Sequence, residues 1–422
     1  MTLTSVRPPD RPVRRLAATL YGYAFLSELV LLYPVYALLF NDTGLTVWQI
    51  STLFVIWATS SILLEVPSGA LADAVSRRLL LCLAPLVTGA GFALWVLAPS
   101  YPAFALGFLL WGAGGALASG ALEALVFDEL IRHGAAGRYA RTIGRAKTAG
   151  TVGVLLSIVL AGPVLAVGDY LAVGAASVLA CLAAAAVATR FPEHRHPATA
   201  AVAAPGDSHT DDDGDDLGWW ASLRAGLAEA HTDRAVRAAV LLVAAVSGIW
   251  GALDEYTPLL ARDTGVTEPT VPLLLLLTWV GVSVGGLLAP AGERWGRRGY
   301  AMLLVLSAAI LAAGALLDHP AGFALIGGAF CGFQLATVLA DARLQTRITG
   351  TSRATVTSLA GMATDVTVIA VYAAYGLLAT GAGNGVAFAV AAVPYLLVAL
   401  LVVTGAGTGA RRTTRQTAGH VG

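Results

Sequence analysis

The stretch Gly69-Ala70-Leu71-Ala72-Asp73-Ala74-Val75-Ser76-Arg77-Arg78 joins two strongly apolar segments of the chain. A looser copy runs from Ala289 to Arg298 and joins another two apolar segments. Small residues, a carboxylate and paired arginines thus occur twice in the same order. This recurrence indicates that one half of the chain is repeated in the other.

The composition is that of a protein embedded in lipid. Hydrophobic residues make up 57% of the 422 residues, charged residues make up 12%, and the mean hydropathy is +0.74. A soluble domain of this composition would expose far too much apolar surface. About 20 apolar helical residues cross a bilayer, and the candidate spans begin near Ala17, Val47, Leu79, Pro102, Gly150, Tyr170, Ala235, Val271, Tyr300, Ala321, Ala354 and Gly385. The sequence therefore predicts an all-α integral membrane protein with twelve transmembrane helices. The first of these is expected to run unbroken through the apolar stretch 17–40.

The basic residues predict the orientation of the chain. Of the 26 lysines and arginines, only Arg262 falls in a loop on one side of the predicted membrane, which leaves 25 on the other. Because positive charge gathers on the cytoplasmic side, both termini are expected to be cytoplasmic and the protein to lie in the cell membrane. Basic residues placed in this way report topology rather than nucleic-acid binding.

A polar segment divides the predicted helices into two groups of six. The predicted organisation is an N-terminal half at 1–189, a cytoplasmic linker at 190–233, a C-terminal half at 234–405 and a cytoplasmic tail at 406–422. The linker holds the acidic run Asp211–Asp216, which is expected to be solvated. A metal site like those of membrane prenyl-transferring enzymes is the alternative. The following residues 217–231 form an amphipathic pattern suited to the membrane interface.

The repeated loop resembles the signature loop between helices two and three of the major facilitator superfamily. A second echo supports the resemblance, since Tyr139-Ala140-Arg141-Thr142 opens the predicted fifth helix and Ser352-Arg353-Ala354-Thr355 opens the eleventh. The resemblance implies a transporter made of two six-helix halves, with a substrate cavity between them lined by helices one, four, seven and ten. Among its members, the bacterial drug:proton antiporters are the most similar.

The resemblance further implies a cytoplasmic latch that opens and closes during transport. Its expected members are Gly69, Asp73, Arg77, Arg78, Asp128, Glu293, Arg297 and Arg298. Ser76 stands where the family usually has glycine, and the second copy has Ala289 and Ala291 in place of the leading glycine and the leucine. The alternative is that these arginines only anchor the topology.

Acidic residues inside the predicted spans are the candidate coupling site. Ionisable groups within a membrane are costly and by default mark a pathway for ions or substrate. Glu28 and Asp365 are expected near the midplane, Glu123 in the inner part of helix four, and Asp254 and Glu255 in the outer part of helix seven. Gln334 adds an uncharged polar group in helix ten. The alternative is that each acid is protonated and donates a hydrogen bond to a neighbouring helix.

These features predict the export of a small lipophilic or cationic compound in exchange for protons. No predicted span holds a lysine, arginine or histidine at mid-depth, so an anionic substrate is disfavoured. Helix four lacks the basic residue of drug:proton antiporters, and Gly162-Pro163 lacks the glycine pair that follows it there. The alternatives are proton-coupled uptake of a sugar or nucleoside and, more remotely, a membrane enzyme or a sensor. No cofactor, metal or nucleic acid is expected, and a single chain is expected to function alone.

Overall fold

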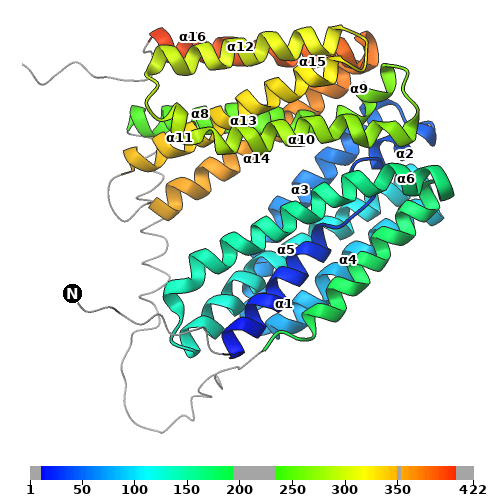
Figure 1. The fold of residues 1–422 in the computed structure, drawn as a ribbon, viewed down its shortest axis with the longest axis vertical. Helices are drawn as coiled ribbons and strands as arrows, with labels where there is room; N and C mark the ends of the chain where they lie inside the picture. The colour runs from blue at the N-terminus through cyan, green and yellow to red at the C-terminus, as the bar shows by residue number, and fades with distance from the viewer. Residues whose placement is uncertain (1–10, 193–232, 349–352, 405–422) are drawn as a thin grey trace, which may run out of the picture. The chain divides into compact units, whose positions relative to one another are not determined.

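The computed structural model describes residues 11–192, 233–348 and 353–404, without the side chains of 65–74 and 353–355. In these ranges every regular element is helical (Figure 1). The α-helices are α1 Arg11–Glu28, α2 Tyr36–Asp42, α3 Val47–Ala74, α4 Arg77–Leu97, α5 Tyr101–Arg132, α6 Tyr139–Ala188, α8 Arg234–Asp254, α9 Thr257–Asp263, α10 Val271–Leu287, α11 Ala289–Gly292, α12 Arg297–Leu316, α13 Gly322–Arg347, α14 Arg353–Ala382, α15 Asn384–Ala391 and α16 Val393–Thr404. Two short 3₁₀ helices are η1 Ala136–Arg138 and η2 Glu268–Thr270.

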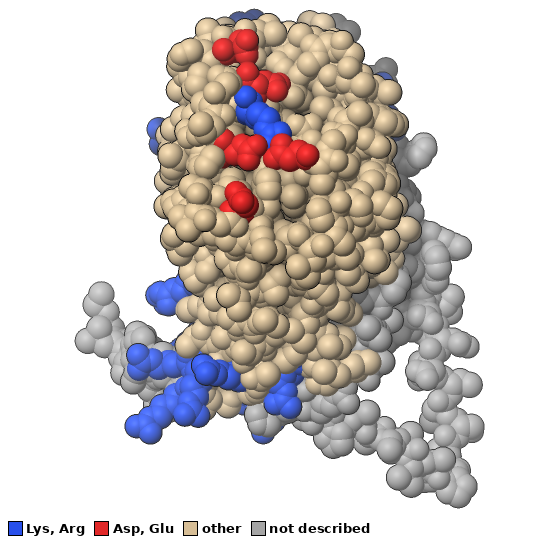
Figure 2. Space-filling model, turned by 90° about the vertical axis from the view of Figure 1, so that its right-hand side faces the viewer, with Lys and Arg blue, Asp and Glu red and all other residues tan. Residues whose placement is uncertain are grey.

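Most of these helices are long and apolar enough to cross a bilayer. Ten candidate spans occur in the described ranges, and α6 is counted among them as one element. Within α6 the backbone turns at Gly168 and Asp169, where Asp169 has a φ of 53°. Figure 2 shows that uncharged side chains make up most of the face in view. The prediction of an all-α membrane protein is thereby confirmed.

The helices pack into two compact units. Unit 1 comprises residues 1–204 together with 265–276, and unit 2 comprises 205–264 together with 277–422. The short segment 265–276 follows α9 in sequence but packs with unit 1. The predicted linker, its acidic run and its amphipathic segment lie almost wholly outside the described residues.

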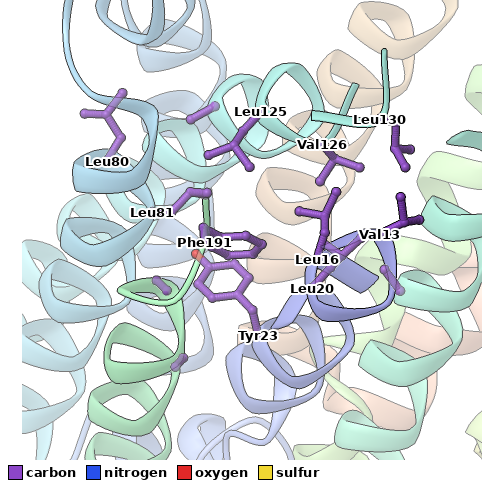
Figure 3. Packing of buried hydrophobic residues seen from close by; sticks show 14 residues of the cluster. Val13, Leu16, Leu20, Tyr23, Leu80, Leu81, Leu125, Val126, Leu130 and Phe191 are labelled. Carbon is purple, nitrogen blue, oxygen red and sulfur yellow. The ribbon is translucent and has the colours of Figure 1, made fainter. Parts of the chain in front are cut away.

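A hydrophobic cluster joins the helices of unit 1 at the end where the chain begins. Leu16 and Leu20 of α1, Leu81 of α4 and Leu125 of α5 are all buried there (Figure 3). Tyr23 meets Phe191 edge to face, with their ring centroids 5.7 Å apart. The van der Waals contacts of these closely packed side chains are individually weak but numerous, and together they hold α1 against its neighbours.

Glycines let the helices of each unit approach closely. In unit 1 a Cβ on Gly91 would lie 2.8 Å from the Gly107 carbonyl oxygen, and in unit 2 a Cβ on Gly285 would lie 2.2 Å from that of Cys331. Small residues are enriched at such helix crossings in membranes because hydrophobic burial does not drive association there.

A close approach between two helix backbones predicts a clear effect of substitution. A Cβ on Gly281 would lie 2.0 Å from the Gly327 carbonyl oxygen, whereas a Cβ on Gly286 of the same helix would meet nothing within 4 Å. We expect Gly281→Val to lower the melting temperature of the purified protein by several degrees, since overpacking costs about 1–3 kcal/mol. Gly286→Val is the matched control and should melt like the parent. Equal melting of the two variants would contradict this packing.

Candidate functional site

The first apolar stretch is interrupted rather than continuous. Helix α1 ends at Glu28 and α2 begins at Tyr36, so the expectation of an unbroken helix through 17–40 is wrong. Pro34 lies in the interruption and has no N–H to donate, which explains the break. The freed N–H of Leu32 donates instead to Ser177 Oγ at 3.1 Å. Irregular backbone at this depth is therefore satisfied by a neighbouring helix.

The carboxylate at this interruption lies against two glycines of α6. A Cβ on Gly150 would lie 3.2 Å from Glu28 Cγ, and a Cβ on Gly153 would lie 2.4 Å from the Phe25 carbonyl oxygen. Within the described ranges no hydrogen bond or ion pair holds the half-buried Glu28 carboxylate. It ends α1 without a basic side chain of the described residues paired with it.

A second interruption follows the same design in unit 2. Helix α8 ends at Asp254 and α9 begins at Thr257, with Pro258 at its second position. The Thr257 hydroxyl donates to the Asp254 carbonyl oxygen at 2.6 Å and closes the turn. Asp254 and Glu255 are half-buried, and Tyr372 of α14 lies within electrostatic range of both. Each unit thus carries acidic residues where its first helix breaks.

The other predicted cavity residues lie on separate helices. Asp365 is half-buried on α14, between Thr364 and Thr367, which contact Gly248 of α8. Gln334 is half-buried on α13, and Glu123 is exposed on α5. Glu28 and Glu123 belong to unit 1, while Asp254, Glu255, Gln334 and Asp365 belong to unit 2.

The predicted latch residues differ between the two copies of the loop. Arg77 forms an ion pair with Asp128 of α5, and Arg78 is exposed. In the second copy Arg297 Nε donates to the Val402 carbonyl oxygen at 2.8 Å, while Glu293 and Arg298 are exposed. Gly69 and Asp73 lie on α3, and the Asp73 side chain is outside the part of the chain that the structure describes.

A hydrogen-bonded network in unit 2 has no counterpart in the sequence-based expectations. The Tyr375 hydroxyl donates to Asn384 Oδ1 at 2.9 Å, and Asn384 Nδ2 donates to Asp263 Oδ2 at 2.8 Å. Tyr256, which follows Glu255 directly, stacks on Tyr375 with their ring centroids 3.7 Å apart. The network connects α9, α14 and α15 and packs against the interruption through Tyr256. Nothing in the sequence signals it, because Asp263 and Asn384 are 121 residues apart in the chain.

A related contact fixes the segment 265–276 in unit 1. The Tyr170 hydroxyl donates to Asp42 Oδ2 at 2.6 Å and lies 3.3 Å from Glu268 Oε2. A Cβ on Gly162 would lie 2.3 Å from the Pro269 carbonyl oxygen.

Among the described residues, no group of three or more histidine, cysteine, aspartate or glutamate residues is arranged to hold a metal ion.

Apolar helices that are long enough to cross a bilayer and that pack closely at glycines define a membrane protein. The model of the Major Facilitator Superfamily matches residues 18–371. The chain therefore belongs to this superfamily, and its membership implies a secondary transporter.

Solved structures show the same fold at low sequence identity. A bacterial homolog of the human lysosomal transporter Spinster, inward-facing and occupied, superposes with a TM-score of 0.71 at 13% identity, covering 97% of this chain and 100% of that one. The nucleoside transporter NupG gives 0.67 at 11%, covering 93% and 98%. A D-xylose-proton symporter gives 0.65 at 16%, covering 92% and 96%. No curated protein matches the chain closely enough in sequence to count as a relative.

The network around Asn384 predicts coupled substitutions. Tyr375→Phe and Asn384→Ala should each lower the melting temperature of the purified protein, because each leaves buried polar atoms without a partner. The double variant should be less destabilised than the sum of the two, by about 0.5 kcal/mol or more. Tyr300→Phe is the control partner, because its hydroxyl donates to the Ala336 carbonyl oxygen in a separate contact. Additive effects for Tyr375 and Asn384 would contradict the network.

Proposed function

We propose that this chain exports a small lipophilic or cationic compound in exchange for protons by alternating access. The ten counted spans become twelve when the two parts of α6 count separately and α1 with α2 counts as one more. The proposed halves are 1–189 and 234–405, joined by the linker 190–233 and followed by the tail 406–422. In this proposal one chain functions alone in the cell membrane, with both termini in the cytoplasm.

The observation that carries this proposal is the pair of interruptions that directly follow carboxylates. Glu28 is the last residue of α1, and Asp254 is the last residue of α8. The C-terminal end of a helix carries a partial negative charge, so a carboxylate placed there adds to it. A proton or a cation bound to the carboxylate compensates both its charge and the partial negative charge of the helix end. Interrupted helices in corresponding positions of two halves are where transporters place their binding sites.

The substrate class follows from charge and aromatic content. A cavity with acidic groups and no basic residue at mid-depth suits a cation better than an anion. Aromatic faces attract cations through the ring quadrupole. Aromatic side chains are concentrated around the first interruption, where Tyr33 and Tyr36 each contact Trp111.

Proton-coupled uptake of a sugar or nucleoside is the second candidate. Gln334 favours it, because in the described ranges its half-buried amide has no hydrogen-bond partner and could accept or donate to a hydroxyl. The fold it shares with a nucleoside transporter and a D-xylose-proton symporter is compatible with this candidate.

Proton movement in inverted membrane vesicles tests the proposal. With an acidified lumen, addition of a transported cation should release protons and raise the lumenal pH. We expect Glu28→Gln and Asp254→Asn to reduce this release at least tenfold, because each removes an exchangeable carboxyl group. Asp365→Asn tests the other acid predicted near the midplane. The measurement is the rate of change of fluorescence of a lumenal pH dye.

Asp169→Asn is the matched control, since it removes an exposed carboxylate at the turn within α6 and should leave the release unchanged. If no cation or drug moves protons, while a sugar or nucleoside accumulates in right-side-out vesicles, export is wrong and uptake replaces it.

The ion pair between Arg77 and Asp128 makes a separate prediction about the latch. The Asp128 side chain is 61% exposed, and exposed ion pairs contribute only about 0–1 kcal/mol to stability. A latch of this strength can open in every transport cycle. We therefore expect Arg77→Gln to change the transport rate severalfold and to leave the melting temperature nearly unchanged. Arg78→Gln serves as the comparison, and a fully active Arg77→Gln variant would identify Arg77 as a topological anchor only.

A further inference from the structure

Three partly exposed aromatic side chains of unit 1 lie nearly parallel to one another. Tyr33 stacks on Trp111 with their ring centroids 5.2 Å apart and their planes at 14°. Trp57 stacks on Trp111 at 4.7 Å and 22°. We call Tyr33, Trp57 and Trp111 the aromatic platform. The rings packed behind it, by contrast, are fully buried: Phe54, Phe92, Trp95 and Phe108. The platform is thus the accessible edge of a larger aromatic core.

Helix packing explains why these rings meet. Helices α3 and α5 cross where a Cβ on Gly112 would lie 2.4 Å from Ser60 Oγ. Trp111 directly precedes this glycine, and Trp57 lies one turn before the serine, so the crossing brings their indoles together. Tyr33 comes from the interruption between α1 and α2. A continuous helix would give this residue a different direction.

The platform lies deep in the membrane. Trp57 is ten residues from Val47, the start of α3, and Trp111 is ten residues from Tyr101, the start of α5. At 1.5 Å per residue both lie roughly 15 Å along their helices, which is about half of a 30 Å hydrocarbon core. Tryptophan that faces lipid is enriched at the interfaces instead.

The indole N–H groups of Trp57 and Trp111 have no acceptor among the described residues. Among the described residues neither Trp57 nor Trp111 donates a hydrogen bond from its ring nitrogen, and Ser27 Oγ is the one buried side-chain polar atom left unpaired there. Both ring nitrogens are therefore accessible. Leaving a donor unpaired in hydrocarbon costs free energy, so an accessible N–H at mid-depth is suited to water or to a ligand.

Small and polar residues of α5 lie beside the platform. Gly115 and Ser119 follow Trp111 at spacings of four, and both are exposed. Residues four apart are neighbours on a helix surface, so these three form one stripe. The same spacing continues through the exposed Glu123 to the apolar Phe127 and Ile131, so the stripe is small and polar next to Trp111 and apolar further on.

We propose that the aromatic platform binds a flat aromatic group of the transported compound, with the indole N–H groups donating to an acceptor on it. The inference rests on the proposed function and narrows its substrate class to planar aromatic molecules that carry a hydrogen-bond acceptor. Parallel aromatic side chains stack on a planar ring at low conformational cost. A positive charge on such a molecule is suited to Glu28, the last residue of α1, which directly precedes the interruption that contains Tyr33.

Binding of a fluorescent probe tests this assignment. Rhodamine 6G has a flat cationic ring system and an ester carbonyl, whereas tetraphenylphosphonium is a lipophilic cation that is neither flat nor an acceptor. Fluorescence anisotropy with the full-length protein in nanodiscs gives the affinity for rhodamine 6G. Tetraphenylphosphonium is added as a competing cation. We expect Trp111→Leu and Trp57→Leu to weaken rhodamine 6G binding about tenfold. Trp111→Phe, which keeps a ring but loses the donor, should fall between.

Two controls separate loss of binding from loss of folding. Trp48→Leu removes an exposed indole near the start of α3 and should bind rhodamine 6G like the parent. Gly115→Leu fills the stripe one turn beyond Trp111, where a Cβ meets nothing within 4 Å. It should melt normally yet bind at least fivefold more weakly. Gly381→Leu of α14 is the matched control for Gly115→Leu, because a Cβ on Gly381 also meets nothing within 4 Å. Unchanged binding in Trp111→Leu and Gly115→Leu would overturn the assignment.

The outcome is distinct from that of the proton-release experiment. If rhodamine 6G binding depends on the platform but no compound moves protons, the platform stands and proton-coupled export fails. If tetraphenylphosphonium moves protons in Trp111→Leu as in the parent and rhodamine 6G binding is unchanged, export stands and the platform is wrong.

Discussion

A bilayer interior offers no hydrogen-bond partner to a backbone N–H or carbonyl group, and this constraint shapes every element of the protein. Helices satisfy it within themselves. The two interruptions at 29–35 and 255–256 do not, and each is completed by a side chain: Ser177 accepts from Leu32, and Thr257 donates to Asp254. Departures from helical geometry occur beside the acidic residues and not at random. The irregular backbone and the costly charges are therefore parts of one feature, present once in each unit.

Close helix crossings set the positions of the acidic and aromatic side chains in the proposed sites. Gly150 and Gly153 bring α6 against Glu28, Gly248 brings α8 against the threonines beside Asp365, and Gly112 brings the two indoles into register. At each crossing a small residue on one helix determines where a large or charged residue on the other can lie. A substitution at such a glycine would displace the acidic or aromatic side chain at the crossing without replacing that residue. The packing of this protein and its chemistry are thus difficult to alter independently.

Hydropathy and charge predicted much of the fold, because the lipid environment enforces length and polarity directly. The starts of the predicted spans near Val47, Val271 and Tyr300 lie close to the observed helix starts. The interruption of the first helix was missed because its residues are apolar, so hydropathy stays high across Pro34. The aromatic platform and the contacts of Asn384 were also beyond reach, since they depend on pairs of residues far apart in sequence. Arg77 and Asp128 were both expected in the latch because they lie at helix ends on one predicted side; they form an ion pair, and their role in a latch stays a prediction.

The segment 265–276 has a consequence for how the protein is assembled. It is separated by more than seventy residues from Pro192, the last described residue before the first gap that follows α6, yet it packs into unit 1 against Gly162 and Tyr170. Domains in a growing chain generally form from the N-terminus onward. Unit 1 cannot be completed in that order, because one of its pieces is synthesised only after α8 and α9. The first unit must therefore wait for part of the second, and the two become interdependent while the chain is still being made.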